Sequence, residues 1–404
     1  MISFKEAIGL IKSLSPMEEE CISSGNAVCR VLSRPVFACV NAPADTSSLK
    51  DGFAIRSDDV KQAGPDNPVS LQITDIITAG DNTFSYLQPG QAIKIMTGAP
   101  VPPGATAVLP QELTLSDGPK RVKALANSEP GRNILPRGSD IRKGEQVIQE
   151  NTLITPGIAG LISGAGVSRV WVYRKPRISV LATGSELAEE GAGTIQGKIF
   201  PSNRATIAAW LKLFGIECGT ELCRDDAGQL ETILTKLAEK NDVVITSGGV
   251  LDGDRDMVIS IMEKIGVNFM FKRCRIGPGK GVCMGRMGDK FFFNLPGGPP
   301  SNYVAFLFIA LPAILRLMGI QATFPQPATG TVDARLKGRS DWTQLILARA
   351  WWQGRNLVAS PLRESSRLKR IAFANAVIVL PEGVSQKKEG SQVEIRLLNR
   401  FPPG

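Results

Sequence analysis

The chain has 404 residues, of which 43% are hydrophobic and 21% charged, and its net charge is +9. This length and composition are typical of a soluble globular protein with about two to four domains. The absence of histidine excludes Ser-His and Cys-His nucleophiles, histidine acid–base catalysis and histidine-ligated metals, so carboxylates, lysines, hydroxyls and backbone amides must carry the chemistry.

Cysteine spacing and hydropathy predict a reduced, cytoplasmic protein that does not enter a membrane. The seven cysteines form no C-x-x-C pair, so we expect them to be thiols of the core. No signal peptide is evident at the N-terminus. The most apolar stretch, 303–315, contains Pro312 and is shorter than the roughly 20 residues of a membrane span, so it predicts a buried helix.

The positive charge is dispersed, and with only 3 tyrosines and 5 tryptophans the chain does not favour a nucleic-acid partner. An anionic small ligand accounts for the charge equally well. Much of the excess follows Gln321 and is expected to form a solvated face; it includes Arg363, Arg367, Lys369, Arg370, Lys387 and Lys388.

The first third of the chain begins with a helix and continues with strands. Ser3 and Glu6 form the pattern of a capping box. Apolar residues in 25–44 predict a strand that ends at Pro43, and 51–113 alternates apolar residues with glycine and proline turns, which predicts a small β-rich insertion. The mixed stretch 133–173 is expected to pack against the early segment.

From Arg177 onward, apolar runs alternate with helical patterns. Parallel strands are expected at 178–181, 243–246 and 291–295, and helices at 203–214, 226–238 and 301–318, with Asn203 and Asp226 as N-caps. This alternation predicts a doubly wound α/β sheet. The strand candidates beyond Pro327 predict a small β-barrel or sandwich; they are 328–335, 343–350, 376–380 and 393–398.

Four glycine-rich corners follow apolar runs within about 120 residues of the chain. They are 181–186, 246–249, 278–280 and 295–298. Glycine allows close approach of the main chain, and free amides at strand ends or helix starts attract phosphate-like groups. Because ligands of such sheets lie beyond the carboxyl ends of the strands, the corners predict one anion-binding site there. Each corner taken alone could equally be a tight turn.

In this order, the motifs of the chain resemble those of the molybdopterin molybdotransferase (molybdenum insertase) family, which includes MoeA and the gephyrin E domain. The resemblance covers nearly the whole chain. It rests on 48–54, 95–104, 131–134 with 138–141, 183–187, 197–203, 247–250 with Asp256, 278–280 and 295–301.

The resemblance implies four domains and a defined reaction. The expected domains are a molybdopterin-binding α/β domain of 1–22 and 176–320, an elongated linking domain of 23–46 and 133–175, a β-rich inserted domain of 47–132, and a C-terminal β-barrel-like domain of 321–404. The substrates would be adenylylated molybdopterin and molybdate, and AMP would be released with the help of Mg²⁺. A homodimer would share the active-site cleft between its subunits, with later transfer of the product to molybdenum enzymes.

The resemblance also assigns roles to individual residues. The catalytic group would comprise Asp256, Glu186, Lys280 and Asp51, and Mg²⁺ would be held by Asp256, Glu186 and Asp140. The pterin substrate would be bound by Thr183, Gly184, Ser202, Asn203, Thr246, Ser247, Gly248, Gly249, Pro296, Gly297, Ser301 and Thr97. Asp256 could instead be an ordinary helix-start acid, a role for which Asp252 and Asp254 are equal candidates.

The chain departs from the family pattern at four positions. The family usually has lysine, proline, asparagine and aspartate where this chain has Gly277, Gly281, Gly298 and Pro201. The missing lysine matters most, because two lysines bind a doubly charged oxyanion better than one. Lys50 is an additional lysine in the Asp51 turn, and we expect it to supply the charge that is missing at Gly277.

Two alternatives to an insertase remain open at this stage. One is a non-catalytic carrier or regulator that binds molybdopterin or finished cofactor, and the other is a scaffold that keeps only the dimeric fold. AMP release distinguishes the first alternative from an enzyme, and copurification of pterin distinguishes the two alternatives from each other.

Overall fold

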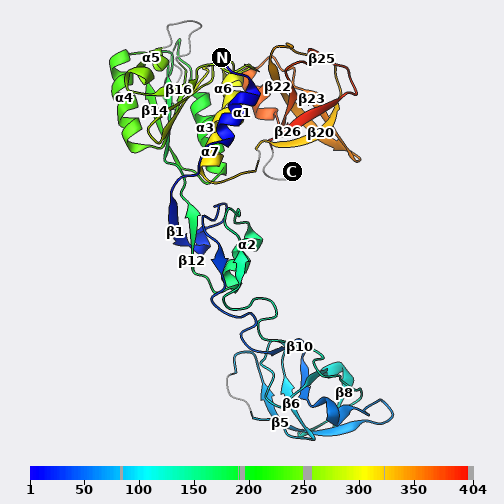
Figure 1. Ribbon diagram of the computed structural model, residues 1–404. Helices are drawn as coiled ribbons and strands as arrows, with labels where there is room; N and C mark the ends of the chain where they lie inside the picture. Colours follow the sequence, from blue (N-terminus) through cyan, green and yellow to red (C-terminus); the bar gives the residue numbers. More distant parts are fainter. Residues whose placement is uncertain (82–84, 190, 192–195, 249–256, 323, 399–404) are drawn as a thin grey trace. The chain divides into compact units, whose positions relative to one another are not determined.

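A computed structural model describes residues 1–81, 85–189, 191, 196–248, 257–322 and 324–398. The chain forms two compact units (Figure 1). One comprises 1–20 with 173–404 and the other 21–172. The four domains expected from the sequence are a finer division, which stays a proposal.

A six-stranded sheet organises the first part of the larger unit. Its order is β14-β13-β15-β19-β18-β16. The first four strands are parallel and the last two are antiparallel. Their bounds are Cys218–Cys223, Ile178–Thr183, Val243–Ser247, Lys290–Leu295, Cys283–Met287 and Asn268–Phe271. The three predicted parallel strands are confirmed, whereas β14, β16 and β18 were not predicted.

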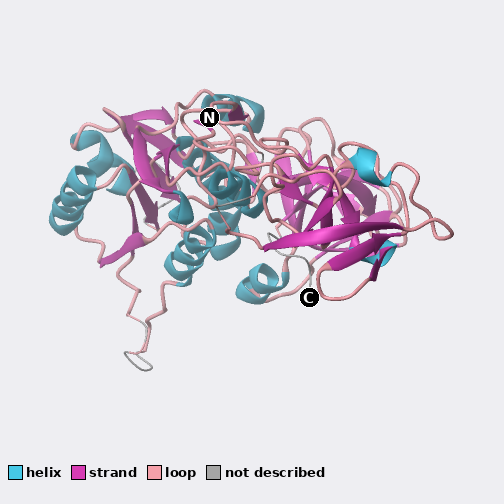
Figure 2. Ribbon diagram, turned by 90° about the horizontal axis from the view of Figure 1, so that it is seen from below, coloured by secondary structure: helices cyan, strands magenta, loops and turns pink. Residues whose placement is uncertain are grey.

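Alternate residues of these strands build two separate cores, so both faces of the sheet are covered by helices (Figure 2). Val180, Ile245 and Phe293 pack in one core with α1, α3, α6 and α7. Val244 and Phe292 pack in the other with α4 and α5. The helices are α1 Phe4–Lys12, α3 Ser202–Leu213, α4 Ala227–Lys240, α5 Met257–Lys264, α6 Pro299–Ala305 and α7 Leu311–Leu317. The doubly wound architecture is therefore confirmed.

Two of the three predicted helix starts are confirmed. The Ser3 side chain accepts from the Glu6 N–H, and the Glu6 carboxylate accepts from the Ser3 N–H, which completes the capping box of α1. Asp226 caps α4 by accepting from Gln229 N. The prediction that Asn203 caps α3 is wrong, because the N-cap is Pro201 and Asn203 already belongs to the helix.

The most apolar helix is an internal element of the fold. Pro299–Leu317 is the one helix within the described ranges that is long and apolar enough to cross a membrane, and 78% of its apolar window is buried. A five-residue π-helix, Phe306–Ala310, joins α6 to α7. Because this helix is buried against α1 and the sheet, it is the core helix that the sequence predicts.

The C-terminal strands form a closed barrel, as predicted. The order β22-β23-β20-β26-β24 closes through pairing of β24 with β22, and β17 adds to β22. The strands are β17 Ile276–Gly277, β20 Gln326–Val332, β22 Thr343–Gln353, β23 Asn356–Pro361, β24 Ala376–Leu380 and β26 Gln392–Leu397. Strand β23 and helix α8, Arg367–Phe373, were not predicted; α8 lies within the basic run.

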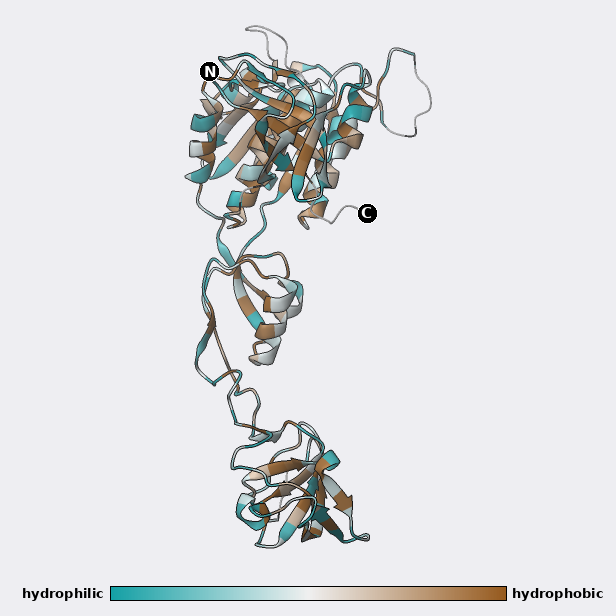
Figure 3. Ribbon diagram, turned by 90° about the vertical axis from the view of Figure 1, so that its right-hand side faces the viewer, coloured by the Kyte–Doolittle hydropathy of each residue, from teal (hydrophilic) through white to brown (hydrophobic). Residues whose placement is uncertain are grey.

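The smaller unit contains the predicted β-rich segment. Its curled sheet has the order β7-β4-β6-β5-β9-β8. The apolar side chains of these strands form two clusters, and the strands are the most hydrophobic part of this region (Figure 3). The strands are β4 Gly52–Ile55, β5 Val69–Ile77, β6 Gln91–Ile95, β7 Ala107–Pro110, β8 Thr114–Ser116 and β9 Arg121–Ala124.

The remainder of the smaller unit consists of short paired strands and one helix. The pairs are β1 Glu19–Ser23 with β12 Arg169–Tyr173, β2 Val36–Phe37 with β11 Gln146–Ile148, and β3 Ser47–Ser48 with β10 Ile134–Leu135; the helix is α2, Pro156–Gly164. The strand predicted over 25–44 is wrong except for β2. Cys29 has φ +66° and Pro35 lacks an N–H donor, so neither suits a continuous strand.

Candidate functional site

Three of the glycine corners lie side by side at one edge of the parallel sheet. Strands β13, β15 and β19 are in register, so that Ala182 is opposite Ser247 and Ser247 is opposite Leu295. The residues that follow these three strands therefore meet at the carboxyl edge of the sheet. This is the position predicted for an anion site.

The glycines allow the segments that follow these three strands to contact one another through their backbones. A Cβ on Gly248 would lie 2.2 Å from the Thr183 carbonyl oxygen, and the φ of this residue is +106°. The Gly248 N–H donates to the Leu295 carbonyl at 3.3 Å. A Cβ on Gly297 would lie 3.5 Å from the Gly248 Cα. The edge of the sheet is thus a main-chain surface that admits no side chain at Gly248.

A small cavity of about 90 Å³ opens at this edge. It collects many of the predicted binding residues on one surface. Its lining includes Thr183, Glu186, Ser202, Asn203, Arg204, Ser247, Gly248 and Gly297. Gly249 and Asp256 lie outside the described residues.

Two asparagines orient the hydroxyl group of Ser247. Asn203 Nδ2 donates to Ser247 Oγ at 3.1 Å and Asn302 Nδ2 donates to the same atom at 2.9 Å. The Asn203 amide also donates to the Gly297 carbonyl, and the Asn302 amide also donates to the Pro296 carbonyl, each at 2.9 Å. Because both lone pairs of Ser247 Oγ are occupied, its O–H is left to donate. The sequence analysis missed Asn302 because the motif that it considered, 295–301, ends one residue earlier.

Thr246 and Thr183 have structural partners instead. Thr246 is fully buried and its Oγ1 donates to Asn294 Oδ1 at 2.8 Å, so its hydroxyl does not line the cavity. Thr183 Oγ1 donates to Asp225 Oδ1 at 3.2 Å, and the Ser185 N–H donates to Asp225 Oδ2 at 3.0 Å. Asp225 follows β14, which the sequence analysis did not predict, and was therefore missed.

The carboxylate of Glu186 lies directly over Gly184. A Cβ on Gly184 would be 2.6 and 2.7 Å from its two oxygens. Glu186 is exposed, and Asp225 lies on the neighbouring loop of the same edge. Across the described parts of the chain, no three acidic, cysteine or histidine side chains form a metal cluster. One or two carboxylates beside a phosphate are nevertheless the usual protein share of a Mg²⁺ site, so the donor set fits this ion.

The cavity also contains a buried arginine that the sequence analysis missed. Arg204 has 7% exposure, and its guanidinium contacts both oxygens of Glu189 at 2.7 and 3.2 Å. Hydrogen bonding from Arg204 lowers the pKa of Glu189. The pair ties the Glu189 side chain to helix α3, which carries Arg204.

The fourth corner, Pro278–Lys280, is not at the edge of the parallel sheet, which corrects the expectation. It follows β17, which pairs with β22 of the barrel. Gly279, with φ +115°, still brings this corner against α6, because a Cβ there would lie 3.3 Å from the Ser301 carbonyl oxygen. Lys280 is exposed at this turn. The corner that carries Lys280 therefore lies next to Ser301 through Gly279.

The missing lysine at position 277 has a local steric explanation. A Cβ on Gly277 would lie 3.0 Å from both amide atoms of Gln344, and a Cβ on Gly338 would lie 3.0 Å from Gln344 Cγ. The Gln344 side chain therefore occupies the space between two glycines. A lysine at 277 would require Gln344 to move.

The smaller unit holds the other predicted residues. Thr97 donates to Asp51 Oδ1 through its N–H at 2.6 Å and through its Oγ1 at 2.8 Å. These hydrogen bonds, the backbone one first, lower the pKa of Asp51. Asp140 is exposed in a turn, and its own backbone N–H donates to the Ala42 carbonyl. Two predicted turns, those of Asp51 and Thr97, are thus joined directly.

Comparison with known families accounts for almost the whole chain. Residues 2–166 match the "MoeA N-terminal region (domain I and II)", 179–316 the "Probable molybdopterin binding domain" and 329–398 the "MoeA C-terminal region (domain IV)". Named relatives extend over the same span. A molybdopterin molybdenumtransferase of Staphylococcus epidermidis is 33% identical over 98% of this chain and 95% of its own length. The chain belongs to the MoeA family.

Further members of the MoeA family agree with this assignment. A molybdopterin molybdenumtransferase of Bacillus subtilis is 32% identical, with 94% of this chain and 90% of the relative covered. The crystal structure of a molybdopterin biosynthesis MoeA protein from Pyrococcus horikoshii superposes with a TM-score of 0.84 at 24% identity, covering 99% of this chain and all of the other. The predicted family and fold class are confirmed.

Proposed function

We propose that this MoeA-family enzyme inserts molybdate into adenylylated molybdopterin and releases AMP. The observation that carries the proposal is the convergence of three strand ends on a main-chain edge where Ser247 Oγ accepts from two asparagine amides. Such an edge, with its remaining O–H donor, suits a phosphate group. The names of the relatives in Staphylococcus epidermidis and Bacillus subtilis supply the chemistry.

We assign the residues of the larger unit as follows. The Gly297 backbone N–H and the Ser247 hydroxyl hold the substrate phosphate, and Gly248 keeps the space beside them clear of side chains. Lys280, which is exposed in the corner that lies against α6, binds molybdate through its charged amine. The remaining predicted binding residues of this edge shape the cavity through the hydrogen bonds described above.

Glu186, with Asp256 and Asp140, is proposed to hold Mg²⁺. The ion, when bound, would neutralise charge on the oxygens of the phosphoanhydride. Glu186 is placed for this role because its carboxylate lies over Gly184 at the cavity. Asp225, which accepts from Ser185 N, is a further carboxylate of the same edge.

Asp51 and Thr97 are proposed to complete the cleft from the second subunit of a homodimer, as the family resemblance implies. The hydrogen bonds from Thr97 hold the Asp51 carboxylate in a fixed position in the smaller unit. We also propose that the protein acts in the cytoplasm and passes its product to molybdenum enzymes.

The test is AMP release from adenylylated molybdopterin and Mg²⁺, measured with and without molybdate. We expect molybdate-dependent release that falls about 100-fold or more in Glu186→Gln and Lys280→Ala, because each removes a charge that acts on the transition state. Lys236→Ala, at an exposed position of α4, is the matched control and should retain full activity.

The same assay distinguishes the alternative function. Tight binding of the pterin without AMP release in the wild-type protein would make it a carrier or regulator and would refute the proposed reaction.

A further inference from the structure

One side chain of the barrel, Gln344, lies against the Pro278–Lys280 corner and has no role in the function proposed so far. Gln344 belongs to β22 and is the partner of Gly277 in the parallel pairing of β17 with β22. Partners in register place their side chains on the same face of a sheet. The preceding pair, Ile276 and Thr343, is buried, whereas Gly277 and Gln344 are half-buried. Gln344 is therefore on the side of the corner that a side chain at 277 would occupy.

The polar end of the Gln344 amide faces the glycine. A Cβ on Gly277 would lie 3.0 Å from both Nε2 and Oε1 of Gln344 but 3.3 Å from its Cδ. On the other side, a Cβ on Gly338 would lie 3.0 Å from Gln344 Cγ. The two glycines thus leave room for this one side chain, and its amide takes the place of a side chain at 277.

Among the residues that the structure describes, the Gln344 amide has no hydrogen-bond partner. A half-buried amide costs free energy unless a ligand or a water molecule satisfies it. A fully ionised oxyanion accepts hydrogen bonds and donates none, so it can use the two Nε2 hydrogens of a glutamine. Such hydrogen bonds to a charged acceptor are stronger than those between neutral groups.

The corner places this amide and Lys280 on one short loop. Three residues separate Gly277 from Lys280, so their Cα atoms are at most about 11 Å apart. The Cys274 N–H donates to the Lys280 carbonyl at 3.1 Å, which closes the loop. One small tetrahedral anion at the loop can therefore accept from Gln344 on one side and from the Lys280 amine on the other.

We infer that Gln344 is an oxyanion-binding residue of this chain, and that its amide N–H donates to molybdate held at the Pro278–Lys280 corner. The inference rests on the proposed function and adds a residue from the barrel to its site. Gln344 takes over the hydrogen bond of the lysine that the family usually has at 277. An amide carries no charge, so the charge expected from Lys50 is still missing at the corner itself.

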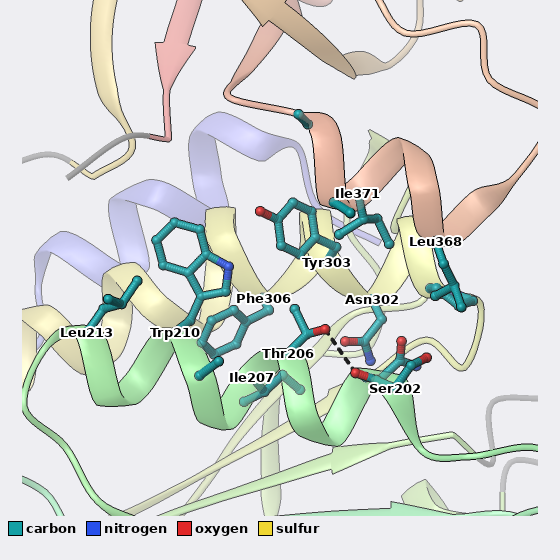
Figure 4. Close-up of a pocket in the computed structure, with 15 residues that line it drawn as sticks. Ser202, Thr206, Ile207, Trp210, Leu213, Asn302, Tyr303, Phe306, Leu368 and Ile371 are labelled. Carbon is teal, nitrogen blue, oxygen red and sulfur yellow. Dashed lines mark hydrogen bonds between the residues drawn. The ribbon is translucent and has the colours of Figure 1, made fainter. Parts of the chain in front are cut away.

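The position of Gln344 makes it a selective probe of the corner. The corner lies against Ser301 of α6, whereas Asn302 and Tyr303 of the same helix line a cavity of about 430 Å³ between α3, α6 and α8 (Figure 4). Gln344 lines neither this cavity nor the smaller one at the carboxyl edge. A substitution at 344 therefore changes the corner without changing the walls of either cavity.

The experiment measures the Kd of molybdate by equilibrium dialysis on the full-length protein. Gln344→Glu keeps the shape of the side chain but replaces the donor by a negative charge, so we expect at least tenfold weaker binding. Gln344→Lys supplies a charged donor and should tighten binding about tenfold. Gln353→Glu and Gln353→Lys are the matched controls, because Gln353 is exposed on the same strand. Both controls should bind molybdate like the wild type.

Further variants separate hydrogen bonding from the filling of space. Gly277→Lys alone forces its side chain against Gln344 and should lower the melting temperature. Combined with Gln344→Ala, the same lysine has room and should bind molybdate at least as tightly as the wild type. Gln344→Leu fills the space without a donor, so it should melt like the wild type but bind molybdate about tenfold more weakly.

Two results would overturn the inference. One is an unchanged Kd of molybdate in both Gln344→Glu and Gln344→Lys. The other is a Gln344→Leu protein that binds molybdate like the wild type, since the side chain would then only fill space.

Failure of this inference and failure of the proposed function give different results. AMP release by the wild-type protein, with and without molybdate, tests the reaction alone. If release depends on molybdate and the Gln344 variants bind molybdate like the wild type, the assignment of Gln344 is wrong and the reaction stands. If no AMP is released but the Kd of molybdate changes as expected across the Gln344 variants, the reaction is wrong and the oxyanion site stands. A wild-type protein that binds no molybdate would refute the inference.

Discussion

Single residues at the carboxyl edge differ sharply in what they tolerate. Gly248 combines a positive φ with a Cβ position 2.2 Å from the Thr183 carbonyl oxygen, whereas nothing lies within 4 Å of a Cβ on Gly298. We expect Gly248→Ala to lower the free energy of unfolding by about 3 kcal/mol, through strain at a special φ and backbone overlap.

Denaturant unfolding checks this prediction, with Gly298→Ala as the control. Because Gly298 is the N-cap of α6, where alanine is less favourable than glycine, that variant should cost no more than about 1 kcal/mol. Equal stability of the two variants would show that the edge can open to admit a side chain.

A Lys50→Ala variant tests whether Lys50 supplies the positive charge that is missing at Gly277, beside the Pro278–Lys280 corner. Lys50 is exposed in the Asp51 turn. Loss of one charge-assisted hydrogen bond corresponds to roughly a tenfold or greater change in affinity, so we expect Lys50→Ala to raise the molybdate concentration needed for half-maximal AMP release by about that factor. The exposed Lys61 supplies the control, Lys61→Ala. If the two variants respond alike to molybdate, the compensation hypothesis fails.

The site residues that could be predicted from the sequence are those whose residue type alone indicates a structural role, as glycine indicates a tight corner. Gly248 and Gly297 were found as corners, and at Gly248 the structure shows the close contact that requires a small residue. Arg204, Asn302 and Gln344 were missed because arginine, asparagine and glutamine serve many structural roles. Their importance comes from partners that are distant in sequence, such as Ser247, 55 residues before Asn302.

At the scale of elements, a buried ion pair fixes the amino ends of β13 and β15. Asp242 is 6% exposed. Arg174 contacts its oxygens at 2.6 and 3.0 Å, and Arg177 donates to it from both backbone and side chain. Burial opposes ionisation of Asp242, but the hydrogen bonds from Arg174 and Arg177 outweigh it and hold the pKa well below the ordinary range.

This pair predicts a pH-dependent contribution to stability. A carboxyl with a depressed pKa in the folded state stabilises the protein above its unfolded pKa of about 4 and loses that contribution as the pH falls further. We expect Asp242→Asn to cost about 3–5 kcal/mol at pH 7 and to differ progressively less from the wild type below about pH 4. Urea unfolding across this pH range measures both effects.

An exposed pair provides the comparison for Asp242. Glu231→Gln removes a pair with Lys264 whose side chains are 36% and 66% exposed, and it should cost no more than about 1 kcal/mol. A pH-independent loss in Asp242→Asn would mean that packing, rather than the charge, is responsible.

Elements were predicted well where the hydrophobic period was strong and poorly where tertiary partners decide the conformation. The residues of β24, Ala376–Leu380, are all buried and were predicted with the correct bounds. Strand β14 is mostly exposed and gave no apolar run. The π-helix Phe306–Ala310 lies in an apolar stretch that predicts only a helix, since backbone hydrogen-bond type leaves no mark on composition.

At the scale of the whole molecule, the proposed shared cleft can be tested by complementation. If Lys280 and Asp51 act at one site from different subunits, a dimer of one Lys280→Ala and one Asp51→Ala chain has one site without either substitution. A C2 dimer has two equivalent sites, so coexpression in equal amounts should restore about a quarter of the wild-type rate of AMP release.

The mass of the particle is the accompanying measurement. A homodimer should have twice the 43.3 kDa mass of the chain by light scattering. A particle with the mass of one chain, or coexpressed variants with no recovered activity although they form mixed dimers, would contradict a site shared between subunits.

The main-chain construction of the carboxyl edge has a consequence for how such a protein can change over time. Amide groups are supplied by every residue type except proline, so most side chains around this edge can be exchanged without removing a phosphate donor. Only positions such as Gly248, where a Cβ overlaps a neighbouring carbonyl, are restricted by geometry. An enzyme built in this way can lose an individual charged ligand, regain it from another loop, and still retain the surface on which its substrate binds.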